Sequence, residues 1–214
     1  MTQTVDFRFE LVFLFSVLVS VICLVTAVVL GALARPSASK RLLKALAVGW
    51  GAYLSIVFLV AAATPQRIIP MNQDLCFDDM CFAVVNVQTV PQLSSGGQPL
   101  RAEGVFYIVT VRVSNHARGR AMSEQGLHAL LWSGGHEYQT SSAGQSVWDA
   151  GHPQNASLTT RLRPGQSVLS DHVFDVGIQA SGLGLVLDSG FTPGYFVIGE
   201  CPLFHNPTIL RLSR

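Results

Sequence analysis

The sequence predicts an all-β, immunoglobulin-like sandwich preceded by a two-helix transmembrane hairpin. Residues 11–34 and 45–66 are long apolar segments without a single charged residue. The short segment between them is rich in cations, and from residue 76 onward short alternating runs are separated by turn residues. In a chain of 214 residues, the part after the second segment is long enough for one domain with its own core.

Each apolar segment is long enough to cross a bilayer as a helix, which needs about 20 residues. Residues 35–44 carry four cations and no acid, and short loops of this kind stay in the cytoplasm. This orientation makes residues 1–10 an extracytoplasmic tail, residues 67–75 a linker and residues 76–214 an extracytoplasmic domain. In a bacterium, the domain would lie on the periplasmic face of the inner membrane. The lipid bilayer is therefore one expected partner.

Two processing alternatives remain for these segments. Ala32-Leu33-Ala34 resembles the small-residue cleavage site of a signal peptide, and so does Ala61-Ala62-Ala63. Both apolar runs are long for a signal peptide, and the head of the first carries acids rather than a basic cluster. Retention of both helices is the main expectation.

Small residues recur every four positions in the second segment, at Ala47, Gly51 and Ser55. Such a stripe lets helices approach closely, so it serves either the packing of the two helices or the docking of another membrane protein. Neither segment contains an ionisable acid, base or histidine, which argues against a transporter acting alone.

Period-two alternation dominates the remainder of the chain. The clearest strand is residues 104–115, and the Gly134-Gly135 pair predicts a tight hairpin between residues 127–132 and 136–140. Further short strands are expected at residues 82–88, 167–176, 183–187, 195–198 and 208–212. No amphipathic helix of convincing length is found. Residues 91–99 and 141–157 are expected to be loops, and they are the candidate binding loops.

Three cysteines follow the apolar segments, and in an oxidising compartment they favour disulfides. Cys76 and Cys81 could bridge locally, which leaves Cys201 over. Alternatively, Cys201 pairs with one of them, since the first and last strands of a sandwich can be neighbours.

A family resemblance rests on three motifs. Residues 105–115 (VFYIVTVRVSN), Leu162-x-Pro164-Gly165 and Phe174-Asp175-Val176 resemble the telokin-like, immunoglobulin-fold extracellular domains of bacterial membrane proteins. The resemblance spans about residues 76–213 and implies a β-sandwich on a membrane anchor, without catalytic residues. The segment from Cys76 to Cys81 (CFDDMC) is similar to a feature of some members, which favours the local disulfide.

Motifs for hydrolysis, metal binding or nucleotide binding are absent from the sequence, so no catalytic, cofactor or metal site is expected. Ser170-Asp171-His172 has the residue types of a triad, but neighbours on a strand point to opposite faces. The acids near the cysteines lack the spacing of a calcium loop: Asp74, Asp78 and Asp79.

Charge indicates little about partners. The part after residue 66 is nearly neutral and has no basic stripe, which argues against nucleic acid. Arg112, Arg118 and Arg120 could form a cationic edge that faces an acidic partner or lipid headgroups, although a solvated turn is the simpler interpretation.

The leading hypothesis is a non-catalytic, membrane-anchored module that binds another envelope protein or a ligand. One alternative is an accessory subunit of a larger membrane complex, docked through the small-residue stripe. Another is an extracytoplasmic hydrolase with an unfamiliar site, for which Asp171 and His172 are the best residues.

Overall fold

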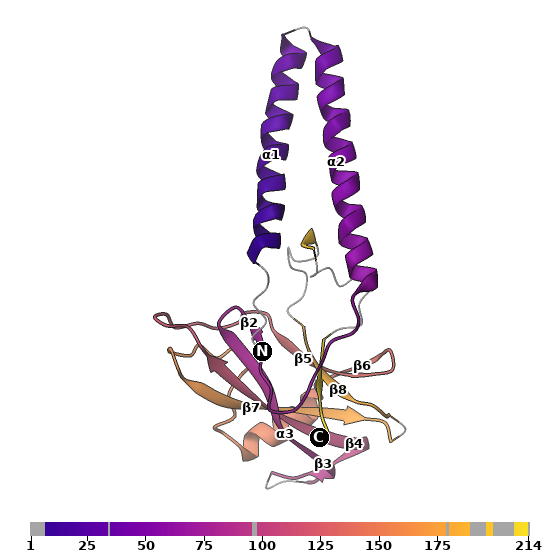
Figure 1. Ribbon diagram of the computed structural model, residues 1–214. Helices are drawn as coiled ribbons and strands as arrows, with labels where there is room; N and C mark the ends of the chain where they lie inside the picture. The colour runs from indigo at the N-terminus through magenta and orange to yellow at the C-terminus, as the bar shows by residue number, and fades with distance from the viewer. Residues whose placement is uncertain are drawn as a thin grey trace. The chain divides into compact units, whose positions relative to one another are not determined.

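The computed structural model describes residues 7–33, 35–95, 98–178, 180–188, 196–198 and 208–213. The chain divides into two units. The helical unit contains the two long helices and residues 196–198, and the sandwich unit contains the described strands and one short helix (Figure 1).

The helical unit is built on α1 (Phe7–Ala32) and α2 (Pro36–Ala63), which lie side by side (Figure 1). Both are long and apolar enough to cross a membrane. Large apolar side chains of α1 are exposed all around the helix, for example Leu14, Phe15, Leu18 and Val25. A helix that is apolar on every side is typical of a buried or membrane environment.

Two side-chain hydrogen bonds join α1 to α2. The Trp50 indole Nε1–H donates to Ser20 Oγ at 2.8 Å, and Ser39 Oγ donates to the Ala27 carbonyl at 2.9 Å. The small-residue stripe is not in this contact, because Ala47, Gly51 and Ser55 are all exposed. The helices pack through the polar pairs instead, so the stripe is free within the described part of the helical unit.

The expected cytoplasmic loop over residues 35–44 is mostly helical. Proline suits the first position of a helix, where no N–H is needed, so α2 begins at Pro36. The Ala, Lys, Arg and Leu residues that follow are good helix formers. The second helix also ends earlier than predicted, at Ala63 rather than at residue 66.

Residues 196–198 contact the helices. Tyr53 Oη donates to the Phe196 carbonyl at 2.8 Å, and the Phe13 and Phe196 rings stack with centroids 6.4 Å apart. Ile198 packs against Val57 and Ala61. The predicted strand over residues 195–198 is therefore wrong for 196–198, whose apolar side chains find partners on the helices; residue 195 lies outside the described residues.

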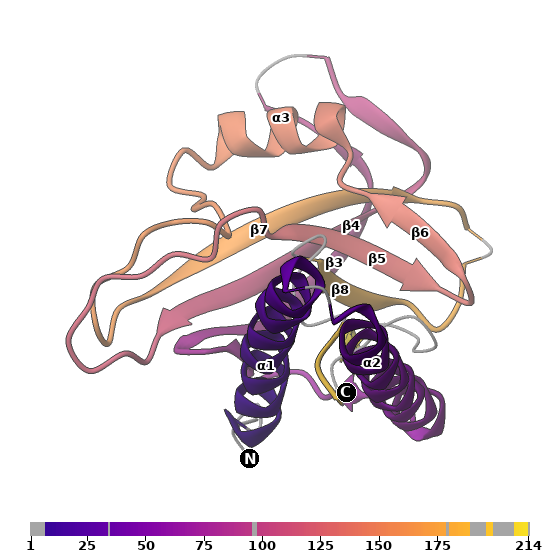
Figure 2. The same cartoon turned by 90° about the horizontal axis from the view of Figure 1, so that it is seen from above.

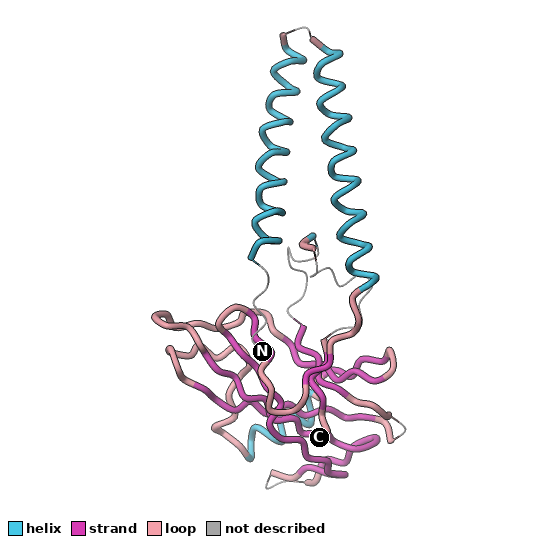
Figure 3. The backbone as a smooth tube through the Cα atoms, in the orientation of Figure 1, coloured by secondary structure: helices cyan, strands magenta, loops and turns pink. Residues whose placement is uncertain are grey.

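The sandwich unit confirms the predicted β-sandwich. One sheet has the order β1-β9-β8-β5-β6 and the other the order β2-β3-β4-β7. Figure 3 draws the strands of this unit in magenta. Neighbouring strands are antiparallel, except β1 and β9. The strands are β1 (Ile68–Ile69), β2 (Leu75–Phe77), β3 (Met80–Leu93), β4 (Leu100–Asn115), β5 (His128–Ser133), β6 (His136–Gln139), β7 (Ser167–Val176), β8 (Gly184–Asp188) and β9 (Ile209–Arg211).

Alternation along β4 builds the core between the sheets. Val109, Val111 and Val113 are fully buried there, among apolar residues of both sheets. Burying one such side chain contributes about 1.5–3 kcal/mol, so this face dominates the packing energy. The predicted strand is confirmed and extends back to Leu100. The linker over residues 67–75 is partly strand, since β1 and the first residue of β2 fall within it.

The predicted hairpin is confirmed, and the structure gives its register. Ser133 lies opposite His136 across the β5–β6 pair. Gly134 and Gly135 have φ of 52° and 96°, the left-handed conformation that a two-residue hairpin turn requires.

The predicted loop over residues 141–157 contains a helix, α3 (Ser142–Gly151). Ser141 caps it by accepting a hydrogen bond from the Gly144 N–H at 3.1 Å. It lies on the outer face of β4 and β7 (Figure 2), where Val147 and Trp148 pack over Phe106 and Val173. The sandwich therefore has a second apolar cluster outside its two sheets.

The simple alternation expected over residues 82–88 is broken. A register shift lies between Val84 and Asn86 and another between Val90 and Gln92. The first shift turns Val87 to the same inter-sheet core as Val84. β3 also extends to Leu93, into the predicted loop over residues 91–99.

Candidate functional site

Both candidate binding loops contribute to one cavity. It has a volume of about 200 Å³ and lies between α3 and the end of β3. The β3 side provides Val90, Gln92, Leu93 and Ser94, and the α3 side provides Val147, Trp148, Gly151 and His152. We call these eight residues the α3–β3 groove. Segments some fifty residues apart in sequence thus converge on a single, largely apolar surface.

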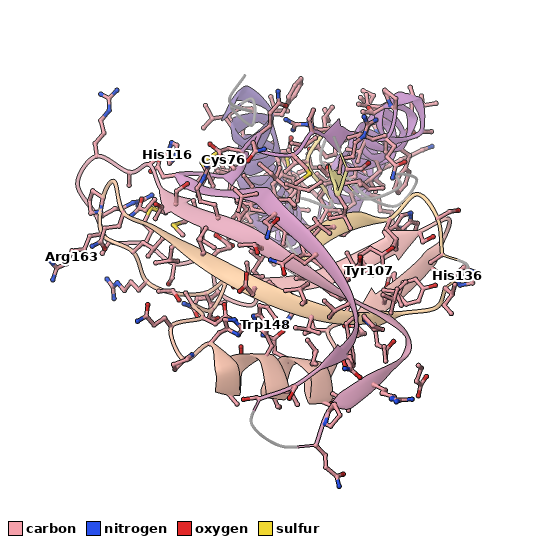
Figure 4. The ribbon with its side chains drawn as sticks, turned by 90° about the horizontal axis from the view of Figure 1, so that it is seen from below. Cys76, Tyr107, His116, His136, Trp148 and Arg163 are labelled. Carbon is pink, nitrogen blue, oxygen red and sulfur yellow. A yellow bond between two sulfur atoms is a disulfide. The ribbon has the colours of Figure 1, made fainter. Side chains whose placement is uncertain are left out.

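Close packing of α3 on the sheet positions the groove. A Cβ atom at Gly144 would lie 2.8 Å from Val173 Cγ1, so only glycine lets the helix approach this closely. The Trp148 indole Nε1–H donates to Asp171 Oδ2 of β7 at 3.0 Å, which fixes its ring between the helix and the sheet (Figure 4).

An aromatic stack forms one wall of the groove. The His152 ring lies 3.9 Å from the Trp148 ring, with 16° between their planes. His152 Nδ1 is 2.9 Å from the Trp148 carbonyl, where it can donate. Among the described residues, those that line the groove include no carboxylate, lysine or arginine. This surface can hold an uncharged apolar or planar group.

The outer edge of β7 is closed by side-chain amides from the segment around α3. Asn155 Oδ1 accepts from the Asp171 N–H at 2.7 Å, and Asn155 Nδ2 donates to the Asp171 carbonyl at 3.0 Å. Gln145 Oε1 accepts from the Val173 N–H at 2.9 Å, and its Nε2 also donates to the Asp171 carbonyl. We call this the closed edge.

Backbone groups complete the closed edge. The Ser141 N–H donates to the Val173 carbonyl at 2.8 Å, and the Ala156 N–H donates to the Leu169 carbonyl at 3.3 Å. An edge strand normally presents unpaired N–H and C=O groups. Here the 141–156 segment satisfies them as a neighbouring strand would.

The opposite edge of the same sheet is different. β2 pairs only with residues 80–82 of β3, and the Asn72 N–H reaches the Val84 carbonyl at 2.9 Å. Over residues 86–90, the described part of the chain provides β3 with no second neighbour beyond β4. We call residues 86–90 the open edge. Alternate residues there turn their N–H and C=O groups away from β4.

Ser170 and His172 lie within hydrogen-bond distance, but their hydrogen bonds do not match those of a catalytic triad. Ser170 Oγ donates to the Ala156 carbonyl at 2.7 Å and lies 2.9 Å from His172 Nε2. Because its one hydroxyl hydrogen is used on Ala156, the serine accepts from His172 Nε2–H. This proton arrangement is the reverse of an activated nucleophile. Asp171 points to the other face, as predicted, and binds Trp148.

Burial controls the protonation of His172. Loss of hydration lowers the pKa of His172 from 6.5 to about 4, against the smaller opposing effect of the Asp171 and Asp149 carboxylates. The imidazole is therefore neutral near pH 7, which suits a ring held on the inner face of β7.

Two of the three arginines of the possible cationic edge have acidic partners. Arg112 pairs with Asp74 at 3.0 Å, and Arg120 lies 3.9 Å from Asp79. A second, open hollow of about 470 Å³ surrounds Arg112 and includes Ser114, His116 and Ser167. Exposed pairs of this kind contribute at most about 1 kcal/mol. Asp74 and Asp79 thus serve as counter-ions to these arginines. No cluster that could hold a metal is found among the described residues.

The structure joins Cys76 and Cys81 by a disulfide across the β2–β3 hairpin, where they are directly opposite and their Cα atoms are 4.0 Å apart. Cys76 and His116 lie at the same end of the sheet (Figure 4), and the His116 N–H donates to the Asp79 carbonyl. The alternative partner, Cys201, lies outside the described residues.

Sequence reasoning missed α3 and with it Trp148, His152 and the amide side chains of the closed edge. A signal was present: Gly144, Val147, Trp148 and Gly151 follow the helical i, i+3, i+4, i+7 spacing after a serine that can cap a helix. Two glycines in ten residues obscured it.

Three solved structures are similar to the chain. A conserved hypothetical protein from Bacillus anthracis is 17% identical, with a TM-score of 0.46, over 57% of this chain and 92% of that one. The yjhA protein from Bacillus subtilis is 12% identical, with a TM-score of 0.42, over 68% and 99%. An uncharacterised β-sandwich protein from Clostridium difficile 630 is 10% identical, with a TM-score of 0.40, over 70% and 96%. No protein-family model and no curated protein matches the chain.

Proposed function

We propose that the protein is a non-catalytic, membrane-anchored module whose immunoglobulin-like sandwich lies outside the cytoplasm and binds another envelope protein or a ligand in the α3–β3 groove. The observation that carries this proposal is the convergence of residues 90–94 and 147–152 on one cavity. Binding surfaces commonly lie on loops held by a rigid sandwich, and both segments are held in this way.

The chemistry of the groove favours an uncharged group as the bound part of the partner. Val90, Leu93 and Val147 provide an apolar floor, and Trp148 with His152 provides a flat wall. Gln92 and Ser94 can give directional hydrogen bonds at the rim. A side chain of a partner protein has the size that a cavity of about 200 Å³ accommodates.

Anchoring is supported by the exposed apolar surface of α1 and α2. The first turns of α2 carry Lys40, Arg41 and Lys44, and a cation-rich connection is retained in the cytoplasm. In this orientation the tail before α1 and the sandwich are both extracytoplasmic.

The groove is tested by filling it in the full-length protein. A Cβ atom at Gly151 would meet only Ser95 Oγ, at 3.8 Å, so this position accepts a side chain, and Gly151→Leu should fill the groove that Gly151 lines. Gly119→Leu is the matched control, because nothing lies within 4 Å of its Cβ position on a distant loop. Affinity capture from native membranes should lose its stoichiometric partner with Gly151→Leu and keep it with Gly119→Leu. Equal capture by both variants would remove the groove from the proposal.

Orientation is tested on intact cells with a membrane-impermeant amine reagent. Lys40 and Lys44 are the only lysines in the chain, so peptide mapping can separate their labelling from that of an N-terminal amine. They should stay unlabelled until the membrane is opened. Labelling before that would place the cation-rich end of α2 outside and reverse the topology.

The exposed small-residue stripe supports a second candidate function, an accessory subunit of a larger membrane complex. Ala47, Gly51 and Ser55 do not face α1 and so are available to a third helix. If this role holds, Gly51→Leu should lose an integral membrane partner during purification in mild detergent. Gly151→Leu should keep that partner.

A further inference from the structure

We propose that the open edge, residues 86–90 of β3, pairs antiparallel with the same strand of a second copy of this chain, so that two four-stranded sheets join across a two-fold axis. This interface differs from the α3–β3 groove and shares only Val90 with it.

The composition of the strand suits pairing with itself. No charged residue occurs between Asp79 and Arg101, so the whole of β3 from Met80 to Leu93 is uncharged. Edge strands are commonly protected from association by charged side chains. In a two-fold pair every residue near the axis meets itself or a close neighbour, and like charges there would repel.

Side-chain exposure is consistent with this pairing. Asn86, Gln88 and Thr89 are exposed, and all three can hydrogen-bond across to a second strand. Val87 and Val90 are half-buried against the two apolar clusters of their own chain. Packing of Val87 and Val90 thus fixes the strand in its own sheet, while the backbone groups at its outer edge can pair with a second strand.

The two register shifts limit the length of the interface. They lie between Val84 and Asn86 and between Val90 and Gln92, and Pro91 lacks an N–H to donate. Bulges and proline bend a strand away from a neighbour. The regular stretch between them is five residues long, which restricts pairing to residues 86–90.

The closed edge decides how many copies assemble. Repeated edge-to-edge addition of copies needs a second free edge on the same sheet. The other edge, β7, is not free, because the N–H groups of Asp171 and Val173 already donate to Asn155 and Gln145. Pairing through β3 therefore uses up the open edge of each copy. The assembly is a closed dimer rather than a fibre.

A five-residue strand pair buries much less than the roughly 1,200 Å² of a stable soluble complex. The pair therefore depends on the high effective concentration of copies held in one membrane. This part of the inference rests on the proposed membrane anchor. We therefore expect the full-length chain to associate in vesicles, and the sandwich unit not to associate in dilute solution.

Cysteine crosslinking in reconstituted lipid vesicles tests the pairing with the full-length chain. Asn86→Cys, Gln88→Cys and Thr89→Cys are introduced one at a time, with wild type reporting any contribution of Cys23 or Cys201. Directly opposed residues of antiparallel strands are close enough to form a disulfide. Gln139→Cys is the matched control, because it is exposed on β6, an edge strand of the other sheet.

At least one of the three positions should form a dimer about tenfold faster than Gln139→Cys, and dilution in lipid should slow it. If Asn86→Cys or Thr89→Cys crosslinks best, adding Gln88→Lys to it should reduce the dimer rate to that of Gln139→Cys; if Gln88→Cys crosslinks best, adding Asn86→Lys should do the same. Adding Gln139→Lys instead should leave the rate unchanged. If all three thiols react with maleimide yet crosslink no faster than Gln139→Cys, the self-pairing is wrong. Loss of groove binding with crosslinking intact would overturn only the proposed function.

Discussion

The two edges of the β2-β3-β4-β7 sheet differ in whether their outward backbone groups have partners. At β7, the amides of Gln145 and Asn155 occupy backbone groups of Asp171 and Val173 in the way that a strand would. At β3, residues 86–90 have β4 on one side and no described strand on the other. The same sheet is therefore sealed on one side and available on the other.

The difference shows that closure of an edge does not require another strand. Side-chain amides carry the same donor and acceptor as a peptide bond, so two well-placed residues can complete a ladder. The closing segment also carries α3 and one wall of the groove. Packing of residues 141–156 against β7 thus both satisfies the edge of this strand and forms one wall of the groove.

Acid should have the largest effect, through the buried His172 of the β7 strand that carries the closed edge. His172 is held neutral beside Ser170, with a pKa lowered from 6.5 to about 4. Between those values the unfolded chain binds a proton that the folded chain does not, so stability falls as pH falls. The loss is about 1.4 kcal/mol per pH unit. Urea unfolding of the full-length protein in detergent, repeated from pH 7 to pH 4, measures it.

The control for acid unfolding is His172→Gln, which removes the titration. Its stability should vary less steeply than that of the wild type in this range, while the carboxylates titrate alike in both. Identical slopes would mean that His172 does not link the closed edge to pH.

Removing one amide of the closed edge is the next largest effect. Asn155→Leu leaves the Asp171 N–H without a partner and deletes a donor to its carbonyl. A buried unpaired group costs about 1–3 kcal/mol, so we expect a loss of about 2 kcal/mol in urea unfolding. Gln154→Leu, at the exposed neighbouring position, should change stability by less than about 0.5 kcal/mol. Equal effects would contradict the role of Asn155.

The hydrogen bond from the Trp148 indole to Asp171 should contribute less to the unfolding free energy than the Asn155 amide. Trp148→Phe keeps an aromatic ring over the sheet but loses the donor to Asp171 Oδ2. A loss of about 1 kcal/mol is expected, because an ionised acceptor is left without its partner. Hydrogen exchange at residues 169–173 should quicken in this variant while that of β5 stays unchanged. Unchanged exchange at both would argue that the helix is held by apolar packing alone.

The open edge should be the least sensitive in stability. Gln88 is exposed and makes no described side-chain hydrogen bond, so Gln88→Lys should change the unfolding free energy of an isolated copy by less than about 0.5 kcal/mol. Dimer crosslinking should disappear in the same variant. A large loss of stability would show that residue 88 is covered within its own chain, and the contrast between the edges would fail.

Prediction from sequence worked where the pattern is local. Alternation identified β4 and β7, and Gly134-Gly135 fixed the β5–β6 register because only a turn with positive φ joins strands this tightly. Length and lack of charge identified the two apolar helices. The opposite facing of Asp171 and His172 followed from strand geometry alone.

Prediction failed where tertiary contacts decide. The segment around α3 is rich in Gly and Ser, and its helix depends on packing over Phe106 and Val173. The bulge near residue 85 turns Val87 inward, which no alternation rule anticipates. The closed edge could not be found, because Gln145 and Asn155 find their partners on a strand that follows later in the sequence. The two loops of the groove were named as candidates, but their convergence depends on the packing of α3.

Residue-resolved hydrogen exchange on the full-length protein in vesicles tests the contrast between the edges most directly. The account predicts that the amides of Asp171 and Val173 are protected at every protein density. It also predicts that alternate amides over residues 86–90 are protected only when copies are crowded, and lose that protection in Gln88→Lys. Equal protection of both edges in sparse Gln88→Lys vesicles would contradict it.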